Sequence, residues 1–287
     1  MLSTPSRRQL LAAALTASLP LAANAQPAPA RLPRLVTING AITEVVYLLG
    51  AEAQLVGTDT TSLYPSAAQK TPKVGYLRQL SAEGVLSLKP DAIIATSDAG
   101  PPVVLDQLRS AGVQVELVKS DYTWNDVTSK VQAVGRAARR EAAARDLQAR
   151  LDAEWAQVGR QVAGVTRTKP RVLFILSHGA SAQVAGQGTA AEAMIRFAGG
   201  VNALSGFQGY RPMTAEAMAS AAPDIILSTD QGIEAIGGVD KLWQRPELAL
   251  TPAFRRKALV VQDALLLLGF GPRLPQAVRE LHSRFYA

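Results

Sequence analysis

Two tyrosine–arginine pairs are the residues best suited to bind a ligand. Tyr76 lies two positions before Arg78, and Tyr210 lies directly before Arg211, in loops that correspond between the two halves of the chain. A free phenol has a pKa of about 10, and a neighbouring guanidinium favours its anion, an oxygen donor for a hard metal cation. Arginine also binds carboxylates through paired donors. From spacing alone, a half-exposed loop tyrosine beside a solvated arginine remains the simpler interpretation.

His178 is a further candidate for contact with a bound ligand. It follows an apolar segment at residues 171–176 that predicts a buried strand. Ligands of α/β proteins bind at the carboxyl ends of such strands. The alternative is a capping or solvent-facing histidine. His282, in the predicted C-terminal helix, is the second of two histidines, and we expect it at the surface.

A glycine-rich segment suggests a different chemistry. Gly186, Gly188 and Ala191 satisfy the G-x-G-x-x-A dinucleotide pattern between a predicted strand and a predicted helix. The acidic residue expected about 20 positions further on is missing from residues 206–210. We therefore expect a turn or a backbone contact to the ligand, with an exported nucleotide-dependent oxidoreductase as the alternative. Serine and metal hydrolase motifs are absent from the sequence, as is cysteine.

The elements that position these residues repeat in the two halves. Glu83 lies seven residues before Pro90, and Glu216 lies seven residues before Pro223; each proline is followed by an aspartate and an apolar strand. Further strands are predicted at 34–39, 55–57, 113–118 and 171–176, alternating with helices. Such alternation favours parallel sheets covered on both faces. The predicted fold is α/β, with two similar lobes of mostly parallel sheet and a ligand cleft between them.

One long helix is expected to connect the lobes. Residues 125–164 carry apolar residues at helical steps, at positions 127, 131 and 134 and again at 147, 151, 155, 158 and 162. A helix of about 35 residues would be roughly 50 Å long and would act as a rigid spine. The expected organisation is a signal peptide at 1–25, an N-terminal lobe at 26–124, the connecting helix at 125–164 and a C-terminal lobe at 165–287.

The N-terminus has the pattern of an export signal. Arg7 and Arg8 precede an apolar stretch at residues 10–21, and small residues at 23–25 suit cleavage after Ala25. The paired arginines and leucines are similar to a twin-arginine signal, with an ordinary secretory signal as the alternative. Removing residues 1–25 takes away two positive charges, so the formal charge falls from +7 to +5. Without a cysteine for lipid attachment, we expect a free periplasmic monomer that binds no nucleic acid.

The mature chain resembles the haem-binding subunits of haemin ABC transporters, the periplasmic binding proteins with a helical backbone. The similarity covers essentially all of the mature chain and is carried by seven segments. These are GTDTTSLYP at 57–65, VGYLR at 74–78, LKPDAII at 88–94, LSHG at 176–179, VAGQGTA at 184–190, AGGVN at 198–202 and GYRP at 209–212.

The resemblance implies a role for each candidate residue. Tyr76 would be the axial iron ligand, with Arg78 favouring its phenolate. His178 would be a sixth ligand or the ligand of a second stacked haem. Tyr210 and Arg211 would hold the porphyrin and its propionates, and Arg273 is a weaker candidate for the same cleft.

The resemblance also implies a partner. One glutamate per lobe, Glu83 and Glu216, would dock on arginines of the inner-membrane permease that works with an ATPase. A carboxylate in a first helical turn already complements the helix dipole, which is the alternative explanation. The function implied is capture of ferric haem as transported cargo, without catalysis. The nearest alternative keeps the fold and changes the cargo to a ferric siderophore or cobalamin.

Overall fold

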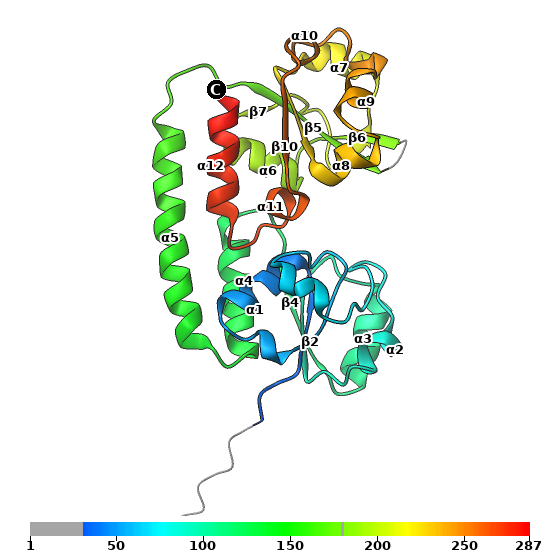
Figure 1. Ribbon diagram of the computed structural model, residues 1–287, viewed down its shortest axis with the longest axis vertical. Helices are drawn as coiled ribbons and strands as arrows, with labels where there is room; N and C mark the ends of the chain where they lie inside the picture. The colour runs from blue at the N-terminus through cyan, green and yellow to red at the C-terminus, as the bar shows by residue number, and fades with distance from the viewer. Residues whose placement is uncertain (1–30, 179–180) are drawn as a thin grey trace, which may run out of the picture. The chain divides into compact units, whose positions relative to one another are not determined.

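The computed structural model describes residues 31–178 and 181–287, except for the side chains of His178 and Ser181. The signal peptide expected at residues 1–25 lies outside the described residues. The helices and strands that the structure describes belong to one unit, Leu32–Ala287, which contains two α/β lobes (Figure 1).

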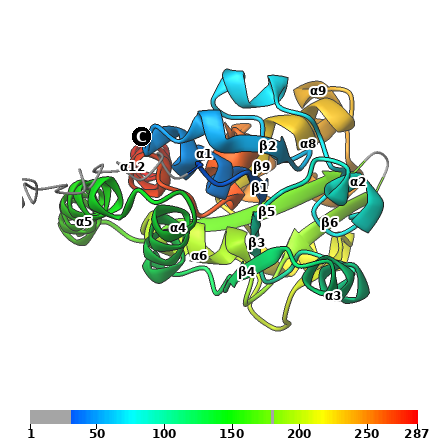
Figure 2. The ribbon, with the colours of Figure 1, turned by 90° about the horizontal axis from the view of Figure 1, so that it is seen from below.

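The N-terminal lobe is built on a four-stranded parallel sheet in the order β2-β1-β3-β4. Alternate residues of its central strands face opposite sides. Leu35 and Ile94 pack towards α1 and α4, whereas Val36 and Ile93 pack towards α2 and α3 (Figure 2). Its elements are β1 (Leu35–Ile38), α1 (Gly40–Leu48), η1 (Glu52–Gln54), β2 (Leu55–Thr58), η2 (Ser66–Lys70), α2 (Ala82–Leu86), β3 (Ala92–Thr96), α3 (Pro102–Ser110) and β4 (Gln114–Val118).

The C-terminal lobe has a mixed sheet in the order β10-β9-β5-β6-β8, with the short β7 beside β5. The strands β10, β9, β5 and β7 are parallel, and β6 is antiparallel to β5 and β8. Its strands are β5 (Arg171–His178), β6 (Ser181–Ala185), β7 (Val201–Asn202), β8 (Tyr210–Pro212), β9 (Ile225–Thr229) and β10 (Leu259–Gln262). Its helices are α6 (Ala190–Phe197), α7 (Ala215–Ala221), α8 (Asp230–Ala235), α9 (Val239–Trp243), η3 (Pro246–Leu248), α10 (Pro252–Arg256), α11 (Ala264–Leu268) and α12 (Leu274–Phe285).

The segment between the sheets differs from the single helix predicted for residues 125–164. It contains two helices, α4 (Trp124–Ala137) and α5 (Glu141–Ala163), which pack against each other. Trp124 stacks on Trp155 with ring centroids 4.9 Å apart, and Gln148 Nε2 donates to Thr128 Oγ1 at 3.1 Å. The long helix α5 then runs beside α12 of the C-terminal lobe (Figure 1). The long helix between the sheets is therefore 23 residues long, about 35 Å at 1.5 Å per residue.

The break between α4 and α5 has a local cause. Arg139 adopts a left-handed conformation with φ of 55°, and the Arg140 N–H donates to Gly135 O, which closes the end of α4. A Cβ at Gly135 would lie 2.6 Å from the Cβ of Ala144. The glycine thus lets the two helices approach closely at the turn.

Residues 269–273 of the C-terminal lobe are inserted against the N-terminal lobe. The ammonium of Lys130 on α4 is 1 % exposed and donates to Gly269 O at 3.3 Å and Phe270 O at 2.8 Å. Arg273 Nε donates to Glu44 Oε1 on α1 at 2.8 Å. Burial raises the pKa of Glu44, although Arg273 opposes the shift. Two charged side chains thus connect this segment to α4 and to α1 of the N-terminal lobe.

Candidate functional site

A buried aspartate fixes the start of the loop that carries Tyr76. Asp59 follows β2 and is fully buried. Its carboxylate accepts hydrogen bonds from the backbone N–H groups of Asn39 and Thr61, at 3.0 and 3.1 Å. It also accepts from the hydroxyls of Thr61 and Ser62, at 2.6 and 2.9 Å. With this many donors the buried charge is satisfied, and the backbone at the carboxyl edge of the sheet is held in place.

The far end of the loop forms a turn around a buried leucine. The Thr60 N–H donates to Gly75 O at 3.0 Å, and Gly75 has a φ of 103°, which favours glycine. Leu77 is buried, and its carbonyl accepts from the Gly100 N–H at 2.9 Å. The side chains on either side of it, Tyr76 and Arg78, are both exposed.

Tyr76, Arg78 and Asp98 form a hydrogen-bonded chain. Arg78 Nη1 donates to Tyr76 Oη at 2.6 Å, and Arg78 Nη2 forms an ion pair with the carboxylate of Asp98. Burial alone would lower the pKa of Arg78, but the charge of Asp98 and the phenol groups of Tyr76 and Tyr122 raise it. The guanidinium is therefore a permanent cation at the Tyr76 oxygen.

Two more tyrosines lie within electrostatic reach of this chain. Burial, followed by the charge of Asp98, raises the pKa of Tyr122. Burial raises the pKa of Tyr210 to about 12, assisted by Tyr122 and opposed by a hydrogen bond with Thr189 and by Arg78. Both phenols are thus protonated donors at neutral pH. Tyr210 is the first residue of β8 in the second lobe, and the charge of Arg78 acts on its phenol.

The protein by itself offers few metal ligands here. Across the described residues there is no group of three or more histidine, cysteine, aspartate or glutamate side chains placed to hold a metal ion. A single phenolate beside a guanidinium can supply one ligand to a metal.

The glycine-rich segment packs against the backbone of residues 207–209, directly before Tyr210. Gly186 N–H donates to Gly209 O at 2.8 Å, and Gln187 N–H donates to Phe207 O at 2.9 Å. A Cβ at Gly186 would lie 2.4 Å from Phe207 O. The glycine thus allows the backbone before Tyr210 to approach, which is the turn that the sequence predicted rather than a phosphate cradle.

Replacing Gly186 by alanine should therefore lower the free energy of unfolding by about 1–3 kcal/mol, the usual cost of overpacking. The matched control is Gly206→Ala, where an added Cβ meets nothing within 4 Å. Urea denaturation of both variants would measure the difference. Equal stability of the two variants would show that the close approach to Phe207 is not needed.

The remaining predicted residues are placed differently. Arg211 is exposed, and its guanidinium lies 4.6 Å from the centre of the Phe207 ring. Since neighbours on a strand face opposite sides, Arg211 points away from the side that holds Tyr210. His178 ends β5, but its side chain lies outside the described residues. Arg273 contacts Glu44 and lies 3.7 Å from the centre of the Tyr64 ring.

Comparison with known proteins identifies the family. The sequence pattern of the family described as periplasmic binding protein matches residues 35–264. The chain belongs to this family. It is therefore the substrate-binding component of an ABC transporter, which works with a membrane permease and an ATPase, and it is not an enzyme. The predicted fold of two α/β lobes is confirmed as that of this family.

Several relatives of this periplasmic binding protein have known ligands. It is 46 % identical to the periplasmic haem-binding protein BhuT, solved in complex with two haems, with a TM-score of 0.84 and 88 % and 97 % of the two chains covered. It is 38 % identical to the haem-binding protein RhuT from Roseiflexus sp. RS-1, with a TM-score of 0.86 and 89 % and 98 % covered. It is 25 % identical to the vitamin B12-binding protein of Vibrio vulnificus, over 91 % of this chain and 92 % of that protein.

Family membership implies export from the cytoplasm. No helix within residues 31–178 and 181–287 is long and apolar enough to cross a membrane.

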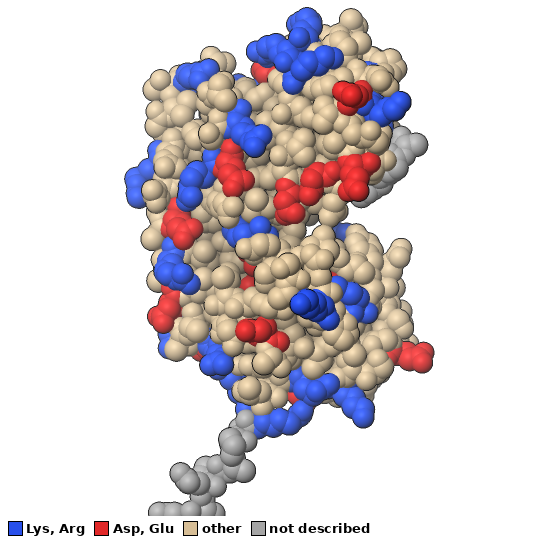
Figure 3. Space-filling view, in the orientation of Figure 1, with Lys and Arg blue, Asp and Glu red and all other residues tan. Residues whose placement is uncertain are grey.

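The surface of the periplasmic binding protein is notched between the two lobes on the side away from α5 (Figure 3).

The two glutamates predicted to dock occupy matching positions. Glu83 is in the first turn of α2, which Ser81 caps by accepting from the Gly84 N–H at 3.4 Å. Glu216 is in the first turn of α7, which Thr214 caps by accepting from the Ala217 N–H at 3.2 Å. Both glutamates are exposed, and neither forms an ion pair with a residue that the structure describes. Each carboxylate is therefore accessible to a cationic partner.

Two residues of the site were missed by sequence reasoning. Asp98 comes two residues after β3, at the carboxyl edge of the sheet, and this position was an available signal. Tyr122 precedes α4, and its N–H donates to the buried Asp126 at 3.0 Å. No local pattern marks Tyr122, because its place depends on how α4 packs.

Proposed function

We propose that this periplasmic binding protein captures ferric haem, with Tyr76 as axial ligand of the iron. The observation that carries the proposal is the 2.6 Å hydrogen bond from Arg78 to the Tyr76 hydroxyl. Haem fills four positions on its iron and needs one or two more donors. Ferric iron accepts phenolate oxygen as an axial ligand, and the positive charge of Arg78 lies beside the Tyr76 oxygen that would bind it. The cargo is bound and released without chemical change.

Other residues would hold the porphyrin. Tyr210 supplies a protonated phenol from the second lobe, and Arg211 would bind a propionate through paired donors. Because Arg211 rests on Phe207 on the opposite face of β8, it would have to leave that ring to do so. His178 would be a sixth ligand or the ligand of a second haem. The similarity to BhuT, which binds two haems, supports both haem as cargo and room for a second one.

Cobalamin is the second candidate cargo, favoured by the similarity to the vitamin B12-binding protein of Vibrio vulnificus.

Titration of the purified protein with haemin, followed by absorption, tests the proposal. Haemin should give a saturable change in the haem bands with micromolar affinity or better, and excess cobalamin should not reverse it. Cobalamin binding with no haemin binding would establish the second candidate in its place.

We propose that the protein is a free periplasmic monomer, made with a signal peptide at residues 1–25 of either the twin-arginine or the ordinary secretory type. The mature chain would comprise lobes at 26–124 and 165–287 joined by residues 125–164. It would deliver haem iron to the inner-membrane permease, docking through Glu83 and Glu216.

Exchanging both docking glutamates for glutamine should reduce transport without changing haemin affinity. The double variant Glu83→Gln/Glu216→Gln removes one charge from each lobe, and the loss of two interfacial ion pairs should lower haem uptake at least about tenfold. Uptake would be measured with the permease and ATPase in proteoliposomes.

Glu141→Gln is the control for this variant. Glu141 is also an exposed glutamate in the first turn of a helix, α5. Its replacement should leave uptake unchanged. A double variant that transports as well as the wild type would exclude Glu83 and Glu216 from docking.

A further inference from the structure

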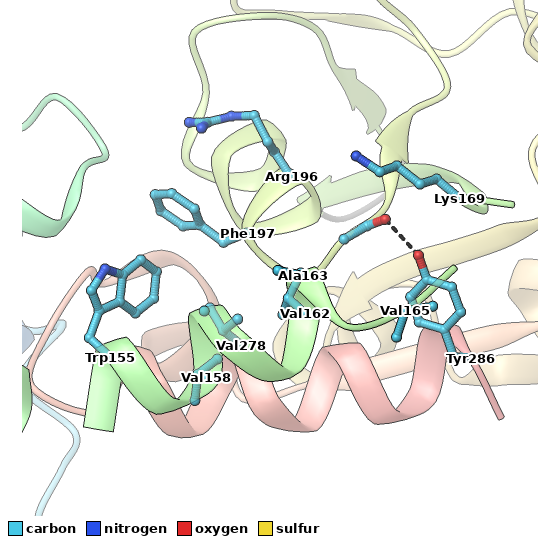
Figure 4. Close-up of a pocket in the computed structure, with 12 residues that line it drawn as sticks. Trp155, Val158, Val162, Ala163, Val165, Lys169, Arg196, Phe197, Val278 and Tyr286 are labelled. Atoms are coloured by element: carbon cyan, nitrogen blue, oxygen red, sulfur yellow. Dashed lines mark hydrogen bonds between the residues drawn. The ribbon is translucent and has the colours of Figure 1, made fainter. Parts of the chain in front are cut away.

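A groove on the C-terminal lobe has the properties of a second small-molecule site. It has a volume of about 340 Å³ and lies between α5, α6 and α12 (Figure 4). This volume is near the lower end of the ~300–1,000 Å³ typical of small-ligand pockets. The residues around Tyr76 are not among those that line it. The groove is therefore a separate feature of the surface.

The groove has a preformed apolar wall. Trp155 stacks on Trp124 at an interplanar angle of 2°, and it meets Phe197 edge-on with ring centroids 5.0 Å apart. Val158 and Val162, one helical turn apart on α5, also line the groove (Figure 4). Since the aromatic rings already contact one another, little ordering is needed before a hydrocarbon chain can pack there.

The rim of the groove is cationic. Lys169 and Arg196 come from different elements and lie on the same side of the groove (Figure 4). Among the described residues that line it, these two are charged and none is an acid. Lys169 has no hydrogen bond or ion pair within the described part of the chain, and Arg196 Nε lies 3.7 Å from Glu192 Oε1, beyond a good hydrogen bond. Both cations retain donors for an anionic head group.

We propose that this groove binds the anion of a single-chain fatty acid. The hydrocarbon chain would lie against Trp155, Phe197 and Val162, and the carboxylate would sit between Lys169 and Arg196. The small volume suits one chain rather than a two-chain phospholipid. The protein's own leader is a poor occupant, because Arg7 and Arg8 precede its apolar stretch and would bring positive charge to a positive rim.

Equilibrium dialysis with radiolabelled myristate below its micellar concentration tests the proposal. The protein should bind one myristate per chain, equally well with and without saturating haemin. Myristyl alcohol, which has the same chain without charge, should bind at least tenfold more weakly. Tryptophan fluorescence should change on myristate addition, because Trp155 lines the groove.

The charge-reversal variant Lys169→Glu/Arg196→Glu should bind myristate at least tenfold more weakly than the wild type. Arg150→Glu is the control, since Arg150 is exposed on the same helix and does not line the groove. Three results would overturn the proposal: no saturable binding, displacement of myristate by haemin, or unchanged affinity in the double variant. Binding to phosphatidylglycerol vesicles without binding of free myristate would overturn it as well.

Discussion

Replacing Lys130 by methionine should lower the free energy of unfolding by about 1–3 kcal/mol, the usual cost of leaving buried hydrogen-bond acceptors without a donor. The ammonium donates to the carbonyls of Gly269 and Phe270 in the C-terminal lobe. Methionine has a similar length but no donor, so both carbonyls would lose a partner in a site closed to water. Asp126, whose charge acts favourably on Lys130, would lose a nearby cation. Urea denaturation followed by circular dichroism would measure the change.

Two further variants separate this effect from loss of a lysine as such. The side chain of Lys119 is 80 % exposed, so Lys119→Met should change stability by less than about 0.5 kcal/mol. The double variant Asp126→Asn/Lys130→Met should recover part of the loss, because asparagine still accepts from the N–H groups of Asp121 and Tyr122 without a buried charge. Wild-type stability in Lys130→Met would mean that these interlobe bonds contribute nothing.

The buried lysine also gives an alkaline pH dependence. Burial lowers the pKa of Lys130 to about 8, with Asp126 opposing the shift. Between pH 8 and the ordinary lysine pKa of about 10.4, the unfolded chain binds more protons than the folded one, so stability rises with pH. This contribution is lost as the pH falls through 8. The free energy of unfolding, measured by urea denaturation at a series of pH values, should rise above pH 8 in the wild type. The rise should be absent in Lys130→Met.

The arrangement of the sheets could be read from the sequence because it depends on local patterns. The strands β1, β3 and β5 are mainly apolar. They lie in the interior of their sheets, where both faces of a strand are buried. The break between α4 and α5 was missed because the backbone conformation of Arg139 depends on packing at Gly135. The gap in the apolar stripe between Val134 and Leu147 was the available signal.

The site was harder to predict than the fold. Tyr76 and Arg78 are close in sequence, and their hydrogen bond follows from one turn. Asp98 joins them because the loops after β2 and β3 meet at the same edge of the sheet, on either side of β1. Tyr210 and Arg211 were expected to act together, but the residues form a strand, and strand geometry separates them. Tertiary pairing of this kind leaves no mark on the local sequence.

Replacing Tyr76 by phenylalanine should weaken haemin binding at least ~100-fold, given that even indirect partners of a metal ligand contribute ~10–100-fold. This expectation depends on the proposed function. Phenylalanine keeps the ring and removes the oxygen that accepts from Arg78, so the iron would lose its phenolate donor while the surrounding turn is preserved. The charge-transfer absorption of phenolate-bound ferric haem should disappear, as followed in a haemin titration.

Tyr47→Phe is the matched control, because Tyr47 lies on α1 and its hydroxyl has no hydrogen bond within the described residues. The control should bind haemin like the wild type. If Tyr76→Phe retains both the spectrum and the affinity, another donor holds the iron, and the role of the Tyr76–Arg78–Asp98 chain would be limited to shaping the loop at the sheet edge.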